Sequence, residues 1–331
     1  MVNAALLNVT FLLVSLFAQF GAAAPPNKIN ETDEDVAKAL DNHIRKLDNA
    51  IQRSPNFIIG GNPVMNDRRW PWQVRIEYLS SYDQKTYLCG GTLVSRRHVM
   101  TAAHCTIDMV KQASYAFMGL ISLNEGSSDM ERKISKITTH PQYNPNTFHA
   151  DIAILELTKD VFISGAVQTV QLRFDDAPIL DSVGTAVVTG WGIWNPALLT
   201  KPSNYLRMAE IPLISHDVCK TRWDNLTPRF DIDSGMLCAG AIGKGTGMGD
   251  SGGPLLAYYN DTYIQIGLTS FGENDKYGLE HQDTYPGVYT RVSKYCSFIS
   301  DASDGMARCD AQQTVYFLAI LAALVYNVIF N

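Results

Sequence analysis

The chain has 331 residues, of which 46% are apolar, and its formal net charge at pH 7 is −6. That apolar content is ample for a packed core, so we expect a folded protein. The negative net charge gives no basis for binding nucleic acid, and we expect no nucleic-acid partner.

The N-terminus has the pattern of a secretory signal peptide. Residues 6–20 are apolar and are followed by the small residues 21–24, although no basic residue precedes the apolar run. We expect cleavage after Ala23, because cleavage one residue later would leave a proline first in the mature chain. Residues 1–23 are therefore predicted to be a signal peptide, and a buried helix is the alternative.

The segment that follows, up to residue 57, has the pattern of a short amphipathic helix. Thr32 and Asp35 resemble a capping box at the start of this helix. Apolar residues then recur near helical spacing, with charged residues between them: Val36, Leu40, Ile44, Leu47 and Ile51. We expect the helix to cover apolar surface, and an unstructured leader is the alternative.

Two separate segments contain a candidate base and its partner. His104 lies in Thr101–Cys105, where small residues flank the imidazole after an apolar, strand-like run. Asp151 opens a second apolar run, and a buried aspartate has to be paired. Accepting the N–H of a histidine would satisfy it and would fix the tautomer that leaves His104 free to take a proton.

The candidate nucleophile lies in Gly249–Pro254, whose sequence is Gly-Asp-Ser-Gly-Gly-Pro. Ser251 stands between glycines, which allow a substrate carbonyl to approach closely. We expect the N–H groups of Gly249 and Ser251 to form an oxyanion hole. The nucleophile elbow of α/β-hydrolases shares the Gly-x-Ser-x-Gly pattern. It requires the order Ser, Asp, His and a following helix, whereas residues 254–258 predict a strand.

Covalent modifications are expected because the chain is predicted to be secreted. Six cysteines imply disulfides, whose pairing the sequence alone leaves open. Sequons for N-glycosylation occur at Asn30, Asn225 and Asn260.

The C-terminus ends in an uncharged apolar run over residues 315–330, which is short for a membrane-spanning helix. Together with Ser303–Gly305 and the polar spacer up to Thr314, this run fits a signal for GPI attachment. A retained membrane anchor and a soluble protein with a buried tail are the alternatives.

The motifs between residues 58 and 306 resemble, in the correct order, those of the chymotrypsin family of trypsin-like serine endopeptidases. They are Ile58–Gly61, Trp70–Val74, Cys89–Gly91, Thr101–Cys105, Asp151–Ala153, Gly190–Gly192, Met236–Gly240, Gly249–Pro254, Ser270–Gly272 and Pro286–Tyr289.

The resemblance implies an all-β fold of two six-stranded antiparallel β-barrels, with the active site in the cleft between them and a short C-terminal helix. The first barrel is expected to end near Arg173 and the second to begin near Leu180. Residues 24–57 would then be an activation pro-segment, 58–306 the protease domain, and 307–331 a spacer with the hydrophobic tail.

The implied function is that of a secreted or cell-surface endopeptidase, made as a zymogen, whose triad of His104, Asp151 and Ser251 forms an acyl-enzyme. Its expected partners are protein or peptide substrates, protease inhibitors and, through the tail, a membrane. A silent homologue acting as a binding module is the alternative, although such homologues usually lose a triad member. We expect no cofactor or metal, because Leu120 and Pro286 replace the residues of calcium-binding and sodium-binding relatives.

For the cysteines, the resemblance suggests the pairs Cys89–Cys105 and Cys219–Cys238. A local bridge between Cys296 and Cys309 is the simplest assignment for the remaining two.

For activation, the resemblance implies that cleavage before Ile58 frees an ammonium group, which pairs with Asp250 and orders the oxyanion loop. Phe57 stands where most relatives carry Arg or Lys. We therefore expect activation by a chymotrypsin-like protease, which includes this enzyme itself. Cleavage after Arg53 followed by removal of two dipeptides is the alternative.

For specificity, the resemblance places Gly245 at the floor of the S1 pocket, where an aspartate would select Arg and Lys. Gly272 and Gly287 match its open walls, and residues 270–272 would align the substrate backbone, with Phe271 where Trp is commoner. An open, uncharged pocket predicts apolar or aromatic P1 residues.

Two departures near this pocket bear on specificity. Gly247 replaces a cysteine, and its partner after Gly272 is also absent, so one disulfide is missing. The long loop after Gly272 is acidic, and a trypsin-like preference supplied by one of its acids is the alternative. These acids are Glu273, Asp275, Glu280 and Asp283.

Overall fold

The computed structural model describes residues 58–66, 69–124, 130–196, 202–226 and 230–310. The predicted signal peptide, the helix expected within residues 32–51, Asn30 and the apolar run 315–330 lie outside these residues. Within the described ranges, no helix is both long and apolar enough to cross a membrane.

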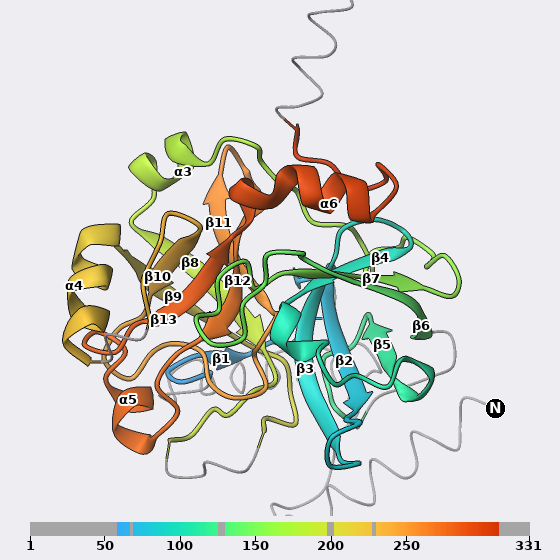
Figure 1. The fold of residues 1–331 in the computed structure, drawn as a ribbon, viewed down its shortest axis with the longest axis horizontal. Coiled ribbons are helices and arrows are strands. Elements are labelled where there is room, and N and C mark those ends of the chain that lie inside the picture. The colour runs from blue at the N-terminus through green and yellow to red at the C-terminus, as the bar shows by residue number, and fades with distance from the viewer. Residues whose placement is uncertain (1–57, 67–68, 125–129, 197–201, 227–229, 311–331) are drawn as a thin grey trace, which may run out of the picture. The chain divides into compact units, whose positions relative to one another are not determined.

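The first barrel consists of six antiparallel strands in the closed order β2-β3-β4-β7-β6-β5 (Figure 1). Its strands are β2 (Gln73–Leu79), β3 (Thr86–Leu93), β4 (His98–Thr101), β5 (Tyr115–Met118), β6 (Glu131–Thr139) and β7 (Ala153–Leu157). Apolar side chains such as Ile76, Val99 and Leu155 fill its interior.

The strands of the second barrel pair in the order β9-β10-β13-β12-β11-β8, and pairing of β8 with β9 closes the barrel. Its strands are β8 (Thr185–Gly190), β9 (Arg207–Ile214), β10 (Met236–Ala239), β11 (Pro254–Tyr259), β12 (Thr262–Phe271) and β13 (Gly287–Arg291), and β1 (Asn62–Pro63) pairs with β9. The prediction of two six-stranded antiparallel barrels is confirmed. β11 also begins at Pro254, where a strand was expected.

An apolar cluster joins the two barrels. Successive side chains of a strand point to opposite faces, so Val99 lies inside the first barrel while Met100 packs in the cluster between barrels. In the second barrel, Leu255 of β11 lies inside the barrel, and Leu256 packs in the cluster between the barrels. This alternation gives each of these strands one face for the interior of its barrel and one for the cluster between the barrels.

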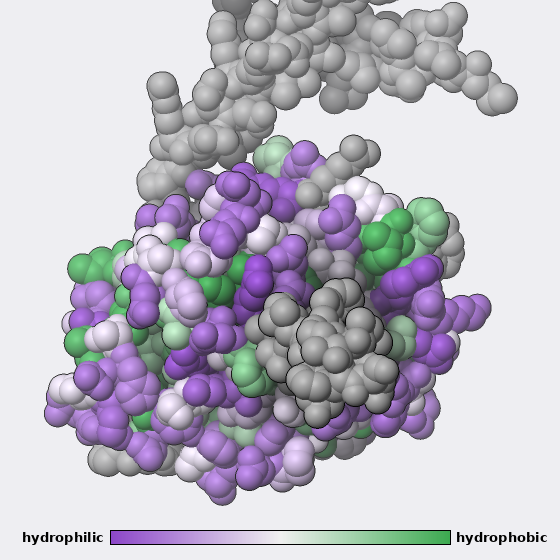
Figure 2. Space-filling model, turned by 90° about the horizontal axis from the view of Figure 1, so that it is seen from above, coloured by the Kyte–Doolittle hydropathy of each residue, from purple (hydrophilic) through white to green (hydrophobic). Residues whose placement is uncertain are grey.

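The helices lie around the barrels, with α6 at the top of the view and α3 to α5 beside the second barrel (Figure 1). They are α3 (Ala177–Ser182), α4 (His216–Leu226), α5 (Lys276–Glu280) and α6 (Cys296–Ala302), with the 3-10 helices η2 (Ala103–Cys105), η3 (Lys111–Ala113) and η4 (Val292–Tyr295). α6 is the short C-terminal helix that was expected. In Figure 2 polar side chains dominate the face seen from above, and apolar residues form small separate groups.

The segment after α6 is packed into the protein. Ser303 is fully buried, and its hydroxyl donates to the Ile299 carbonyl at 2.7 Å while accepting from the Ala307 N–H at 3.0 Å. Cys309 is also buried and is bonded to Cys296. Lipid attachment at Ser303 would remove Ala307 and Cys309. The hydrogen bond from the Ala307 N–H and the disulfide to Cys296 would then be lost, which counts against that position.

Asn225 and Asn260, two of the three sequons, are exposed. Asn260 and Asp261 form the turn between β11 and β12, and both have positive φ, 50° and 60°. Such values suit the tight turn of a hairpin, in which Asn and Asp are favoured. Glycosylation at these positions remains a prediction.

Candidate active site

His104 lies in η2, directly after β4, and Asp151 holds its imidazole. The Nδ1–H of His104 donates to Oδ2 of Asp151 at 2.8 Å, and the His104 backbone N–H donates to Oδ1 at 2.9 Å. Because a carboxylate accepts hydrogen bonds, Nδ1 carries the proton and Nε2 is left as an acceptor. The His104 side chain is 24% exposed, whereas that of Asp151 is 0% exposed.

Asp151 is also held by hydroxyl groups of the second barrel. Ser270 on β12 donates to Oδ2 of Asp151 at 2.5 Å, and Thr290 on β13 donates to its carbonyl at 2.9 Å. We predicted Ser270 only as a residue beside the substrate backbone. No sequence pattern marks a serine as the partner of an aspartate that lies 119 positions away.

The charge of Asp151 alters the pKa of His104. Burial lowers the pKa of the imidazole, but the attraction and the hydrogen bond of Asp151 outweigh burial, so the pKa is raised above 6.5. The imidazole therefore takes a proton readily, which suits a general base.

Ser251 lies in a tight turn between Gly249, with φ 95°, and Gly252, with φ 76°. These φ values favour glycine, and a Cβ at Gly252 would lie only 2.1 Å from Oγ1 of Thr101. The Ser251 carbonyl accepts from the Gly90 N–H of β3 at 2.7 Å, which fixes the turn to the first barrel.

The backbone N–H groups of Gly249 and Ser251 donate to no protein acceptor within the described residues. Two such donors on one turn are available to a substrate oxygen, as an oxyanion hole requires. No hydrogen bond joins the Ser251 hydroxyl to His104 in the described part of the chain. Contacts between nucleophile and base are often looser without a substrate.

Asp250 is buried next to this turn, with 1% of its surface exposed. Its Oδ1 accepts from the Gly192 N–H at 2.8 Å and its Oδ2 from the Gly247 N–H at 3.0 Å. A Cβ at Gly190 or Gly192 would lie within 2.1 or 2.5 Å of the carboxylate, so these glycines make room for it.

No cation within the described ranges pairs with Asp250. Burial raises the pKa of its carboxyl to about 6, and the two backbone hydrogen bonds offset only part of this rise. The segment that begins at Ile58 lies nearby in the fold: Ile58 is 1% exposed, and the Gly245 N–H donates to the Ile59 carbonyl at 3.0 Å.

The cavity beside Ser251 matches the predicted S1 pocket in four of its five predicted residues. Ser270, Phe271, Gly272 and Gly287 line it, whereas Gly245 does not. The side chain of Gln282 covers Gly245 instead, and a Cβ at Gly245 would lie 1.8 Å from Oε1 of Gln282. Sequence reasoning missed Gln282, because its place depends on how the long loop after Gly272 folds.

Three of the four acids in that loop do not line the cavity. Asp275 accepts from the Gly278 N–H at 2.6 Å and so caps α5. Glu280 lies 3.9 Å from Lys276, and Asp283 accepts from the Thr284 hydroxyl at 3.3 Å. Among the four, only Glu273 lines the cavity.

Phe271 also forms part of an aromatic wall. Its ring centroid lies 5.0 Å from that of Phe148, 4.9 Å from Phe230 and 5.2 Å from Trp223. Phe148 in turn contacts the His104 ring edge to face, at 5.8 Å. The wall thus extends an apolar surface from the cavity towards the imidazole.

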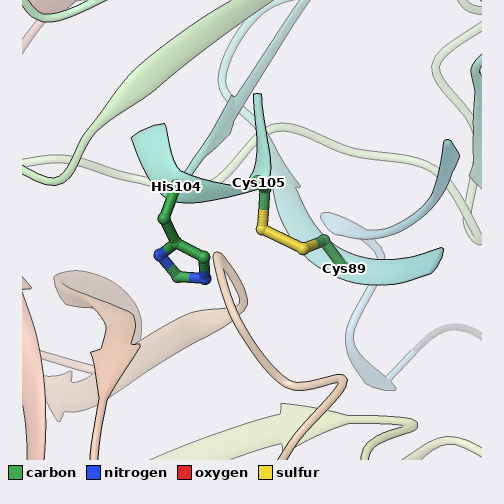
Figure 3. Close-up of side chains that lie close together, drawn as sticks. All are labelled: Cys89, His104 and Cys105. Atoms are coloured by element: carbon green, nitrogen blue, oxygen red, sulfur yellow. A yellow bond between two sulfur atoms is a disulfide. The ribbon is translucent and has the colours of Figure 1, made fainter. Parts of the chain in front are cut away.

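The structure contains the three disulfides that were expected, Cys89–Cys105, Cys219–Cys238 and Cys296–Cys309. Cys89, His104 and Cys105 bring three potential metal ligands together. Figure 3 shows the two sulfurs bonded to each other beside the imidazole. Because metal binding by cysteine requires a thiolate, this cluster serves to anchor η2 to β3 and is not a metal site.

Comparison with known proteins agrees with this geometry. A family model described as Trypsin matches residues 58–299. The chain is also 33% identical over 246 residues to a protein named Tryptase from Mus musculus, a match that covers 73% of this chain and 87% of that protein. The chain therefore belongs to the trypsin family and is a serine endopeptidase.

Proposed function

We propose that His104, Asp151 and Ser251 form the catalytic triad of this protease and that the N–H groups of Gly249 and Ser251 form its oxyanion hole. The observation that carries this proposal is the pair of hydrogen bonds from His104 to the buried Asp151, which leaves Nε2 as the acceptor. This acceptor and a serine on a glycine turn with two available N–H donors are the parts that acyl transfer needs.

In this mechanism Nε2 of His104 takes the hydroxyl proton as Ser251 attacks the scissile carbonyl. The negative charge that develops on the carbonyl oxygen is held by the Gly249 and Ser251 N–H groups. His104 then gives its proton to the leaving amine, and an acyl-enzyme remains. Water, deprotonated by His104, hydrolyses the ester and restores Ser251.

The protein is made as a secreted zymogen in this proposal, with residues 24–57 as its pro-segment. Cleavage before Ile58 would supply an ammonium group to the buried Asp250, which has no cationic partner within the described residues. Phe57 favours cleavage by a chymotrypsin-like protease, including this enzyme, over the route through Arg53. Cell-surface attachment through residues 315–330 would complete the assignment.

The S1 cavity supports a preference for uncharged, apolar or aromatic P1 residues. Gly245 leaves no charge at the floor, and three of the loop acids serve elsewhere. A trypsin-like preference is the second candidate, because the acidic residue Glu273 lines the cavity. Burying a P1 lysine without a partner would be costly.

A panel of fluorogenic peptides with Phe, Tyr, Leu, Ala or Arg at P1 tests both function and preference. We expect kcat/KM for Phe or Tyr to exceed that for Arg by at least about 10-fold. A higher value for Arg would favour Glu273 as the determinant. Labelling of Ser251 by an organophosphonate provides the test of catalysis itself; a silent binding module would neither react nor cleave any peptide.

The pH profile of the matured enzyme should report His104. A protonated imidazole has no acceptor, so kcat/KM should fall as the pH drops through the His104 pKa, which lies above 6.5. Measurement of kcat/KM between pH 5 and 8, with active-site titration at each pH, checks this. A flat profile over that range would remove His104 as the base.

A further inference from the structure

Gln282 is a buried polar side chain on the wall of the S1 cavity, with 3% of its surface exposed. Its Nε2 donates to the Thr246 carbonyl at 2.7 Å. Because a carbonyl can only accept, this bond fixes the amide orientation and directs Oε1 away from Thr246.

Oε1 of Gln282 has no hydrogen-bond partner in the described part of the chain. It lies where a side chain at Gly245 would stand, 1.8 Å from the position of that Cβ, and 3.4 Å from the corresponding position at Gly287. The oxygen is therefore almost inaccessible to water, and it lies beside Gly245 and Gly287, whose missing side chains leave room for it at the floor of the pocket.

The loop that carries Gln282 is held in this place by the backbone. The Gly243 N–H donates to the Glu280 carbonyl at 2.7 Å, and Ile242 pairs with His281, next to Gln282. Asp275 caps the preceding α5. Gln282 is thus positioned by several contacts before any substrate arrives.

We infer that Gln282 determines P1 specificity by presenting a neutral hydrogen-bond acceptor at the floor of the S1 pocket. This inference rests on the proposed protease function and refines its preference for uncharged P1 residues. A ligand that fills the pocket must bring a donor to Oε1, because an unmet buried acceptor opposes binding. The P1 residue selected is tyrosine, whose ring suits an apolar wall and whose hydroxyl donates at the tip.

Phenylalanine lacks that donor and would leave Oε1 without a hydrogen bond. A pocket built to bind a hydroxyl group discriminates against the analogue that lacks it. Lysine has donors, but its charge would face a neutral amide rather than a carboxylate at the floor. The neutral amide of Gln282 therefore favours P1 tyrosine over both P1 phenylalanine and P1 lysine.

The test uses the matured full-length protease and two peptides that differ only in Tyr or Phe at P1. We expect kcat/KM to be about 10-fold higher for the Tyr peptide. In Gln282→Leu this ratio should fall to about 1 or below, because the acceptor is gone while the apolar wall remains. Gln168→Leu, a change at an exposed glutamine, is the matched control and should retain the wild-type ratio.

A second variant covers the case in which Gln282→Leu does not fold. Gln282→Glu keeps the length of the side chain and places a carboxylate at the floor, so cleavage after P1 Lys or Arg should rise at least about 10-fold. The inference is wrong if the ratio of kcat/KM for the Tyr and Phe peptides stays unchanged in Gln282→Leu, which includes the case in which both values fall by the same factor. It is also wrong if Gln282→Glu gains no basic substrate. Failure of wild-type protein to react with an organophosphonate would instead reject the proposed function.

Discussion

Replacing Ser251 with alanine is expected to lower kcat by about a million-fold, because the variant has a base and an oxyanion hole but no nucleophile. Expressed alone, Ser251→Ala should also accumulate with the Phe57–Ile58 bond intact. That result follows if the enzyme itself cleaves this bond, because Phe57 is an uncharged aromatic P1 residue, although a poorer one than tyrosine for the inferred pocket. Peptide hydrolysis and N-terminal sequencing of the secreted protein measure the two effects separately.

Ser297→Ala is the matched control, because Ser297 is exposed on α6, away from the cavity. It should mature and cleave peptides like the wild type. Normal maturation of Ser251→Ala in the absence of active enzyme would exclude self-activation and leave an external protease or the Arg53 route. Retained peptide hydrolysis in that variant would exclude Ser251 as the nucleophile.

Replacing Asp250 with asparagine should lower kcat/KM by about 10²- to 10³-fold, because the new ammonium group of Ile58 would lose its buried partner. Removing one member of a buried ion pair costs about 3–5 kcal/mol. The expected consequence is an open oxyanion loop in most molecules. Active-site titration should show a smaller competent fraction, which distinguishes loss of the switch from slower chemistry.

The direction of the Asp250 pKa shift supports the proposed role of an ammonium group beside this carboxyl. A carboxyl whose pKa rises from 3.8 to about 6 in the folded protein stabilises the fold only while it is protonated. That contribution is lost as the pH rises through about 6. At neutral pH the unpaired carboxylate then costs about 3 kcal/mol, at about 1.4 kcal/mol for each pKa unit.

The control for Asp250→Asn is Asp301→Asn, which removes the same charge from an exposed position on α6. Its kcat/KM should remain within a factor of about two of the wild type. Wild-type activity in mature Asp250→Asn would show that the oxyanion loop is ordered without the ion pair.

The candidate triad was predictable from local sequence, whereas the fold was predictable only from the resemblance of the ordered motifs to a known family. Glycines around Ser251, small residues around His104 and an acid before an apolar run each have a nearby physical cause. The two barrels were predicted from the resemblance to the chymotrypsin family and not from the periodicity of apolar residues. The order of the three triad segments was enough to reject the α/β-hydrolase elbow.

Contacts between distant segments were not predictable in this way. Ser270 reaches Asp151 across the barrel interface, and only the assembled fold brings the two together. Gln282 covers Gly245 because the loop after Gly272 folds through α5 and pairs with residues near position 242. Sequence reasoning left open whether an acid of that loop enters the pocket, and it did not identify Gln282, the neutral residue on the cavity wall.

The two halves of the site are secured by different chemistry. A disulfide from Cys89 ties Cys105, and with it the His104 segment, to β3. The loop that carries Gln282 is secured by hydrogen bonds alone, since Gly247 provides no sulfur there. We therefore expect reduction of Cys89–Cys105 to loosen the His104 segment directly, whereas it breaks no covalent bond of the loop that carries Gln282.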